Sequence, residues 1–170
     1  QDHKYSGSED AGPDAAYAFG VKSWGDEARA SALAEVVRNV GFKNEVGRTS
    51  EGRDGSEALS SSAVAHVLAI VQDSDRLDAI GAIGIARCLT LGGAWRRTLH
   101  DPSVPPRVGM SKEEYAASGH EATTLNHFAE KLVHLRGLMK TEAGRAVAER
   151  RHTRMLQWLA DFHKEWIGEE

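Results

Sequence analysis

The chain has 170 residues, of which 41% are hydrophobic and 27% are charged, and its formal net charge is −4. These values fit one soluble domain of ordinary size with a sizeable core, and they exclude a broad basic surface for nucleic acid. The chain has one cysteine, Cys88, which excludes an internal disulfide and suits a reducing compartment. The apolar neighbours of Cys88 predict that it is a small core residue rather than a nucleophile.

The first half of the chain predicts two helices followed by a long polar loop. The first helix runs from Pro13 to about Ser23, with proline in its first turn. The second is predicted from Glu27 to Val40, with apolar residues at helical spacing and Gly41 at its end. Glycine, serine and threonine are frequent in residues 44–62, which we interpret as a flexible surface insertion.

The second half continues the helical pattern. Residues 63–91 predict one or two consecutive helices, and prolines predict an irregular loop over residues 101–119. The apolar residues within 125–139 predict a further helix, and Thr141 starts the last one. No segment shows the sustained alternation of a β-strand, so the chain is predicted to be all-α.

The most informative segment runs from Val71 to Arg87. Three carboxylates and an arginine fall within six residues of it, between an apolar run and a run of small residues. Acidic side chains at the edge of a core are costly to bury unless they are paired or bind a metal. In a helix Asp75 and Asp78 share a face. Three small residues continue this face: Ala79, Ala82 and Ala86. The segment therefore suits a metal site between closely packed helices, or a capped core helix.

This segment resembles the last motif of the HD-domain metal-dependent phosphohydrolases, in their small YedJ-like branch. Two further segments resemble that branch in the same order, residues 126–132 (NHFAEKL) and residues 139–152 (MKTEAGRAVAERRH). The resemblance covers nearly the whole chain and implies an HD-domain-like helical bundle. It implies one HD-like domain over residues 1–170 that lacks its N-terminal helices.

In that superfamily a His, a His-Asp pair and a later Asp hold a divalent metal, for which Mn, Fe and Mg are candidates. Asp75 matches the later Asp, so the resemblance makes it a metal ligand and a catalytic residue. The only His-Asp dipeptide, His100-Asp101, follows Asp75 and is out of order. One carboxylate cannot hold a catalytic metal, which usually has three or more protein ligands. The other ligands would come from an upstream segment or a second chain, or the site has been lost.

Three basic residues are candidates for phosphate contacts. In the family a basic residue of the stretch that contains Lys131 faces the active-site cavity, and Lys4 and Arg76 are similar candidates. Lysine and arginine suit this role because phosphate oxygens accept charge-assisted hydrogen bonds. The arginines between residues 145 and 154 are expected to be solvated helix charges.

The resemblance implies a metal-dependent phosphohydrolase that acts on a nucleotide or another small phosphate ester or anhydride, with the metal polarising a phosphoryl oxygen and generating hydroxide. The alternative is a catalytically incomplete HD-like domain that serves as a structural or interaction subunit, with a protein partner or a second copy of the chain. Nucleic-acid binding depends only on the basic residues 145–154, and the acidic net charge disfavours it.

Cellular location is indicated only by the absence of signals. No apolar run approaches the roughly 20 residues that a membrane-spanning helix needs, and no secretory signal is visible. We therefore expect an intracellular, cytoplasmic protein without a membrane partner. An organellar location stays open because the sequence does not start with Met.

Overall fold

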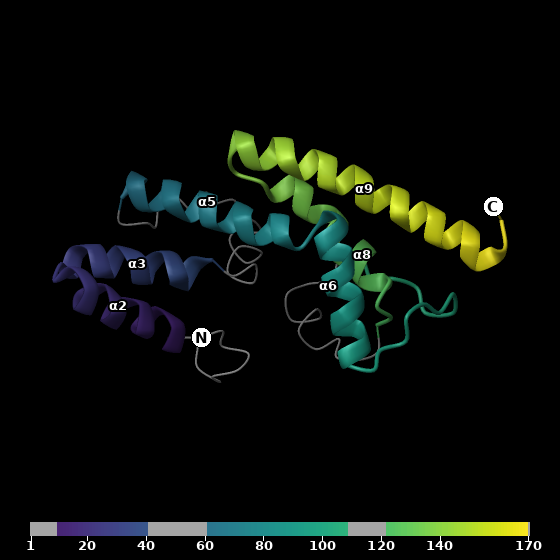
Figure 1. Cartoon of the computed structure of the whole chain (residues 1–170), viewed down its shortest axis with the longest axis horizontal. Coiled ribbons are helices and arrows are strands. Elements are labelled where there is room, and N and C mark those ends of the chain that lie inside the picture. The colour runs from purple at the N-terminus through teal and green to yellow at the C-terminus, as the bar shows by residue number, and fades with distance from the viewer. Residues whose placement is uncertain (1–9, 41–60, 109–121, 170) are drawn as a thin grey trace. The chain divides into compact units, whose positions relative to one another are not determined.

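The computed structural model describes residues 10–40, 61–108 and 122–169 (Figure 1). All regular structure in these residues is helical and no strand occurs in them, which confirms the all-α prediction. The elements follow in this order: α2 (Ala11–Trp24), α3 (Glu27–Asn39), α5 (Ser62–Asp78), α6 (Gly81–Ala94), α8 (Asn126–Glu130), the 3-10 helix η1 (Leu132–Leu138) and α9 (Glu142–Ile167). The predicted insertion at residues 44–62 lies almost entirely outside the described residues.

The helices belong to two compact units, Gln1–Gln72 and Asp73–Glu170. The boundary falls within α5, so the last turn of that helix belongs to the second unit. The single domain over residues 1–170 stays a prediction. No described helix is by itself long and apolar enough to cross a membrane; α5 and α6 meet the length and composition criterion only as a bent pair.

In the first unit α2 and α3 form a helical hairpin. Gly25 ends α2 with a φ of 63°, and Asp26 caps α3 by accepting a hydrogen bond from the backbone N–H of Arg29 at 3.0 Å. Gly20 lets the helices approach, because a Cβ on it would lie 2.8 Å from the Cβ of Ala30. Three buried side chains form the apolar core of this unit: Val36, Val64 and Leu68.

In the second unit α6 packs against α9, and α8 and η1 supply much of the buried apolar surface. The core of this unit contains these side chains: Ile80, Ile85, Leu125, Phe128, Leu132, Leu135, Met139, Ala148 and Met155. Two glycines allow close approaches. Gly81, with a φ of 74°, lies against the side chain of Arg151, and a Cβ on Gly92 would lie 2.2 Å from the hydroxyl oxygen of Thr124.

The acidic segment forms two helices with a sharp break between them. α5 ends at Asp78 and α6 starts at Gly81, and the two helices are bent by 66°. The predicted face that continues from Asp78 through Ala82 and Ala86 is therefore wrong, and both alanines are exposed. The helix is broken by Ile80, whose backbone is extended (φ −126°, ψ 166°), and by Gly81, whose φ is 74°; the side chain of Ile80 is only 1% exposed at this turn.

The helix predicted over residues 125–139 is interrupted. α8 ends at Glu130, Lys131 has a φ of −140° and a ψ of −57°, and the chain continues as η1. The side chain of Glu130 is 3% exposed and accepts a hydrogen bond from the backbone N–H of Arg107 at 3.0 Å. A tertiary contact thus competes with the local helical pattern at this position. Residues 101–108, the described part of the predicted irregular loop, contain neither helix nor strand.

Candidate functional site

The last turn of α5 carries three aspartates and one arginine in two different surroundings. Asp73 and Arg76 are 3% and 4% exposed, whereas Asp75 and Asp78 are exposed. This division follows from helical spacing, because residues three apart share a face. The turn therefore has a buried face, made by Asp73 and Arg76, and an exposed face, made by Asp75 and Asp78.

Asp73 joins the buried face to the start of α9. Its Oδ1 accepts a hydrogen bond from the backbone N–H of Lys140 at 2.9 Å, and its Oδ2 accepts from the backbone N–H and the hydroxyl of Thr141 at 2.8 and 2.7 Å. The hydroxyl oxygen of Thr141 also accepts from the N–H of Gly144 at 2.9 Å and caps α9, as predicted. A Cβ on Gly144 would lie 2.3 Å from Oδ2, so glycine leaves room for the carboxylate. The carboxylate charge lies where the dipole of α9 favours an anion.

Arg76 is held from two directions. Its Nη1 donates a hydrogen bond to the backbone carbonyl of Leu138 at 2.8 Å and lies 3.4 Å from Oδ1 of Asp73. Burial lowers the pKa of Arg76, but a guanidinium with a carboxylate and a carbonyl as partners stays charged at neutral pH. These contacts give Arg76 a structural role, and its contact with phosphate stays a prediction.

The two aspartates of the exposed face differ in their partners. Asp78 forms an ion pair with Arg87 of α6, which also donates to the backbone carbonyl of Asp78 at 3.0 Å. The carboxylate of Asp75 forms no hydrogen bond or ion pair with another described residue. An accessible carboxylate of this kind is chemically suited to bind a cation, and its assignment as metal ligand and catalytic residue stays a prediction.

The described residues do not supply a complete metal site. No group of three or more His, Cys, Asp or Glu side chains within them is placed to hold an ion, and Asp75 alone does not suffice. The His100-Asp101 dipeptide does not fill the gap, because no third His, Cys, Asp or Glu side chain of the described residues joins it; the Asp101 carboxylate accepts a hydrogen bond from the backbone N–H of Ser103 at 2.9 Å. The His100 ring lies against three aromatic side chains of α9, with centroids 5.0 to 5.8 Å away: Phe162, His163 and Trp166.

The other two predicted phosphate contacts are placed differently. Lys4 lies outside the described residues. Lys131 is half-buried at the junction of α8 and η1, where its backbone N–H donates to the carbonyl of His127 at 3.1 Å. No described hydrogen bond or ion pair joins Lys131 to Asp75. The structure thus brings Asp75 and Arg76 together on one turn, and the roles of Lys4 and Lys131 stay predictions.

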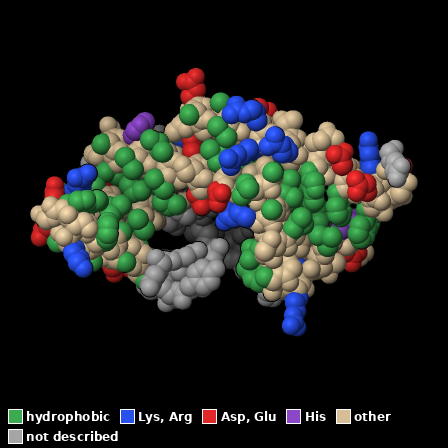
Figure 2. Space-filling view, viewed as in Figure 1, with side chains coloured by type: hydrophobic (Ala, Val, Ile, Leu, Met, Phe, Trp, Pro, Cys, Tyr) green, Lys and Arg blue, Asp and Glu red, His purple; other side chains and the backbone are tan. Residues whose placement is uncertain are grey.

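The arginines of α9 are not all solvated helix charges. Arg151 is half-buried and donates a hydrogen bond to the backbone carbonyl of Leu77, in the last turn of α5. The prediction is therefore wrong for Arg151, because the close approach of α6 at Gly81 covers its side chain. Arg150 and Arg154 are exposed, and Figure 2 shows basic side chains gathered over α9.

Cys88 lies in α6 and is half-buried, so it is less buried than the core residue that the sequence predicts. Its Sγ lies 3.8 Å from the backbone carbonyl of Thr124, to which the thiol donates. Burial raises the pKa of the Cys88 thiol to about 11. Because the thiolate is the reactive species, this shift disfavours a nucleophilic role near neutral pH.

The sequence alone does not predict the link between Asp73 and Thr141. The two residues are 68 positions apart, and no local pattern shows that they touch. Two signals were available: Asp73 and Arg76 at helical spacing next to an apolar run, and a glycine three residues after the threonine that caps α9. A small residue at that position indicates that something approaches the first turn of the helix closely.

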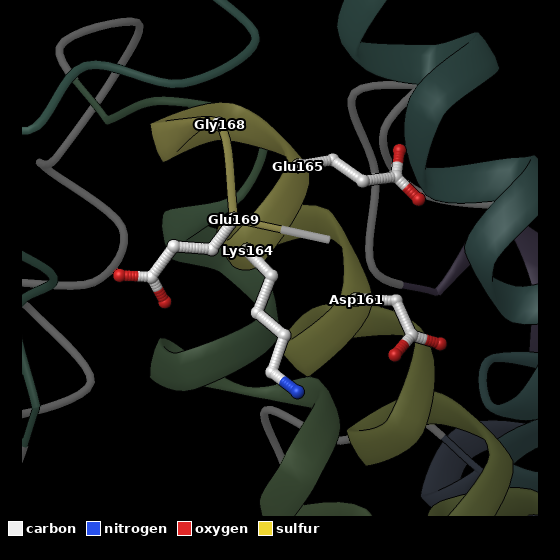
Figure 3. A pocket seen from close by; sticks show the side chains of 5 residues that line it. All are labelled: Asp161, Lys164, Glu165, Gly168 and Glu169. Carbon is white, nitrogen blue, oxygen red and sulfur yellow. The ribbon is translucent and has the colours of Figure 1, made fainter.

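A pocket lies at the opposite end of α9 from Thr141. Five residues of the last turns line it: Asp161, Lys164, Glu165, Gly168 and Glu169 (Figure 3). All five are exposed, and none of the predicted site residues is among them. This charged surface is therefore separate from the candidate site at the end of α5.

No family model matches the chain. Among curated proteins, it is 32% identical over 139 residues to the uncharacterized protein YpgQ of Bacillus subtilis, and the match covers 82% of the chain and 54% of that protein. The chain thus spans about half the length of this relative.

Several solved structures are similar to the chain, including the following three. A protein of Lactobacillus plantarum matches with a TM-score of 0.68 and 33% identity, over 88% of this chain and 64% of that one. B. subtilis YpgQ in complex with ADP matches with a TM-score of 0.59 and 26% identity, over 90% and 61%. An HD-superfamily hydrolase of Bacillus thuringiensis matches with a TM-score of 0.52 and 31% identity, over 95% and 86%.

Proposed function

Because the chain belongs to the HD superfamily of hydrolases, we propose that the protein hydrolyses a small phosphate ester or anhydride, with a nucleotide as its substrate. The observation that carries this proposal is the accessible carboxylate of Asp75, in the Asp-Arg-Leu context of the superfamily's last motif. The ADP bound to YpgQ supports a nucleotide as the ligand.

In this proposal Asp75 is a ligand of a divalent metal, with Mn, Fe and Mg as candidates. Metal dependence is typical of the superfamily. No group of three potential ligands occurs in the described residues, so a complete metal site requires further ligands from outside them. Lys4, Arg76 and Lys131 neutralise charge on the phosphate, the role in which Lys and Arg donors are most effective.

The surroundings of the three aspartates favour Asp75 over its neighbours. The oxygens of Asp73 are occupied by donors from the start of α9, and binding a metal there would break these buried hydrogen bonds. The carboxylate of Asp78 is neutralised by Arg87. Asp75 is therefore the aspartate of this turn whose carboxylate is available to a ligand.

The proposal is tested by hydrolysis assays on the native protein with Mn²⁺, Fe²⁺ or Mg²⁺, using nucleoside mono-, di- and triphosphates and p-nitrophenyl phosphate. We expect Asp75→Asn to lower kcat by at least about 100-fold. Mutation of a residue that hydrogen-bonds to a metal ligand typically costs about 10- to 100-fold, and loss of the ligand itself should cost more. Asp78→Asn is the matched control, three residues along the same exposed face, and keeps kcat within about threefold of the parent.

Two results of these assays would count against the proposal. Undiminished hydrolysis by Asp75→Asn would remove Asp75 from the site. Absence of both bound metal and hydrolysis with every ion would favour the second candidate, an HD-like structural or interaction subunit. The observation behind that candidate is the incomplete ligand set of the described residues, and it predicts a stable partner in size-exclusion chromatography of the native material.

A further inference from the structure

The residues on either side of Asp75 are tied to the same neighbouring segment of the chain. Before it, Asp73 accepts hydrogen bonds from Lys140 and Thr141. After it, Arg76 donates to Leu138, and the backbone carbonyl of Leu77 accepts from Arg151 of α9. Asp75 itself takes part in none of these contacts and is exposed.

We propose that Asp73, Arg76 and Thr141 are positioning residues, which hold the last turn of α5 against the start of α9 and so fix the carboxylate of Asp75. This inference rests on the proposed function, in which Asp75 is a residue of the active site. Asp73 and Thr141 act through the backbone of the turn and not through contact with substrate, and Arg76 has this positioning role in addition to its proposed contact with phosphate.

The end of a helix needs such support if it carries a functional group. The last turn of a helix frays readily, because its carbonyls lack partners within the helix. Here the carbonyl of Leu77 accepts from Arg151, and the side chains of Asp73 and Arg76 make four further hydrogen bonds to residues 138–141. The turn is thereby held in one position relative to the second unit's long helix.

The donors around Asp73 form a network with little freedom to rearrange. Thr141 is central to it, because its hydroxyl donates to Asp73 at 2.7 Å while the same oxygen accepts from Gly144 at 2.9 Å. Buried networks of this kind are rigid when every member is satisfied. A shift of about 1 Å in a catalytic group can lower the rate about 100-fold. Loss of a hydrogen bond in this network should therefore lower kcat by displacing the carboxylate of Asp75.

The test compares Thr141→Val, Thr141→Ser and a cap control, Asp26→Ala, in the native protein. Valine has the shape of threonine without its hydroxyl, and serine restores the hydroxyl. Asp26 caps α3 through Arg29 in the first unit, so Asp26→Ala removes a helix cap without touching the turn that carries Asp75. The readouts are kcat and KM with Mn²⁺, and hydrogen exchange of the backbone amides of residues 75–78.

We expect Thr141→Val to lower kcat by about 10- to 100-fold with KM within about threefold of the parent, and to speed exchange at residues 75–78 by about tenfold. Thr141→Ser returns both quantities to within about threefold of the parent, and Asp26→Ala leaves both unchanged. Parental exchange at residues 75–78 in Thr141→Val would overturn the proposal. An equal drop in kcat for Asp26→Ala would assign the effect to global stability and would also overturn it.

The exchange measurement separates this inference from the proposed function. If the parent protein hydrolyses none of the phosphate compounds, the proposed function fails, and exchange at residues 75–78 still shows whether Thr141 holds the turn. If the parent is active and Thr141→Val keeps both parental exchange and parental kcat, the proposed function stands and the positioning role fails.

Discussion

The last turn of α5 contributes to two aspartate–arginine pairs that differ in their exposure and in the further donors around the carboxylate. In Asp73–Arg76 the carboxylate and guanidinium side chains are 4% and 5% exposed, whereas in Asp78–Arg87 they are 61% and 58% exposed. Breaking a buried pair leaves a charge without water, whereas an exposed pair is worth little because water replaces either partner. The difference teaches that burial and additional donors, rather than pairing itself, make a carboxylate structural.

Asp75 lies between these two pairs in sequence and belongs to neither. Its neighbours on the buried face are held by residues 138–141, from the end of η1 to the N-cap of α9, and its neighbour on the exposed face is paired with Arg87 of α6. The turn therefore combines a fixed backbone with one accessible carboxylate. This combination suits a residue that binds a ligand, since its position is set before the ligand arrives.

The largest expected effect comes from removing the acceptor of the buried pair. Asp73→Ala leaves the N–H groups of Lys140 and Thr141 and the charge of Arg76 without this partner. We expect the free energy of unfolding to fall by about 3–5 kcal/mol, as for other buried charges that lose a partner. Urea unfolding followed by circular dichroism measures it. A loss below about 1 kcal/mol would contradict this, because it would mean that Asp73 stabilises the fold no more than an exposed ion pair does.

A smaller effect is expected from filling the space beside Asp73. Gly144→Ala places a Cβ 2.3 Å from the Asp73 carboxylate, so the free energy of unfolding should fall by about 1–3 kcal/mol despite the better helix propensity of alanine. The matched control is Gly93→Ala in α6, where a Cβ meets nothing within 4 Å, and there we expect a gain of about 0.5 kcal/mol. Effects of the same sign at both glycines would contradict the close approach.

The smallest effect is expected from the exposed pair. Asp78→Asn should lower the free energy of unfolding by about 0.2–1 kcal/mol at low salt, and the difference should vanish in 1 M NaCl, where the Debye length is about 3 Å. The effect of Asp73→Ala should persist in the same salt, because water and ions do not reach the buried pair. Thermal unfolding of the two variants at both salt concentrations checks this contrast.

The parts of the structure that sequence predicts well are those with a local cause. The start of α9 depends on Thr141 and the residues just after it, and the end of α2 and start of α3 depend on adjacent turn and cap residues. The break at Lys131 is not predictable in this way. It accompanies a hydrogen bond between Glu130 and Arg107, two residues that are 23 positions apart in the sequence. A propensity pattern contains no information about that contact.

The candidate site shows the same division. Asp75 was identified from a motif, whose residues are contiguous in the sequence. The role of Asp73 was not, because it depends on donors 67 and 68 positions further on and on the absence of a side chain at Gly144. The burial of Arg76 is unpredictable for the same reason, since its partner carbonyl at Leu138 belongs to η1, whereas the sequence predicts a continuous helix there.

We propose that Asp73 stabilises the fold and that Asp75 binds the metal. This division of roles is tested most directly by the free energy of unfolding of the native protein and of Asp75→Asn, each measured in EDTA and in saturating Mn²⁺. In EDTA we expect the two to agree within about 0.5 kcal/mol, because Asp75 supports no described structure. Mn²⁺ at 100 to 1,000 times its Kd should stabilise the parent by about 3–4 kcal/mol and leave Asp75→Asn unchanged. Equal stabilisation of both proteins by Mn²⁺, or a loss in EDTA as large as that of Asp73→Ala, would contradict the assignment.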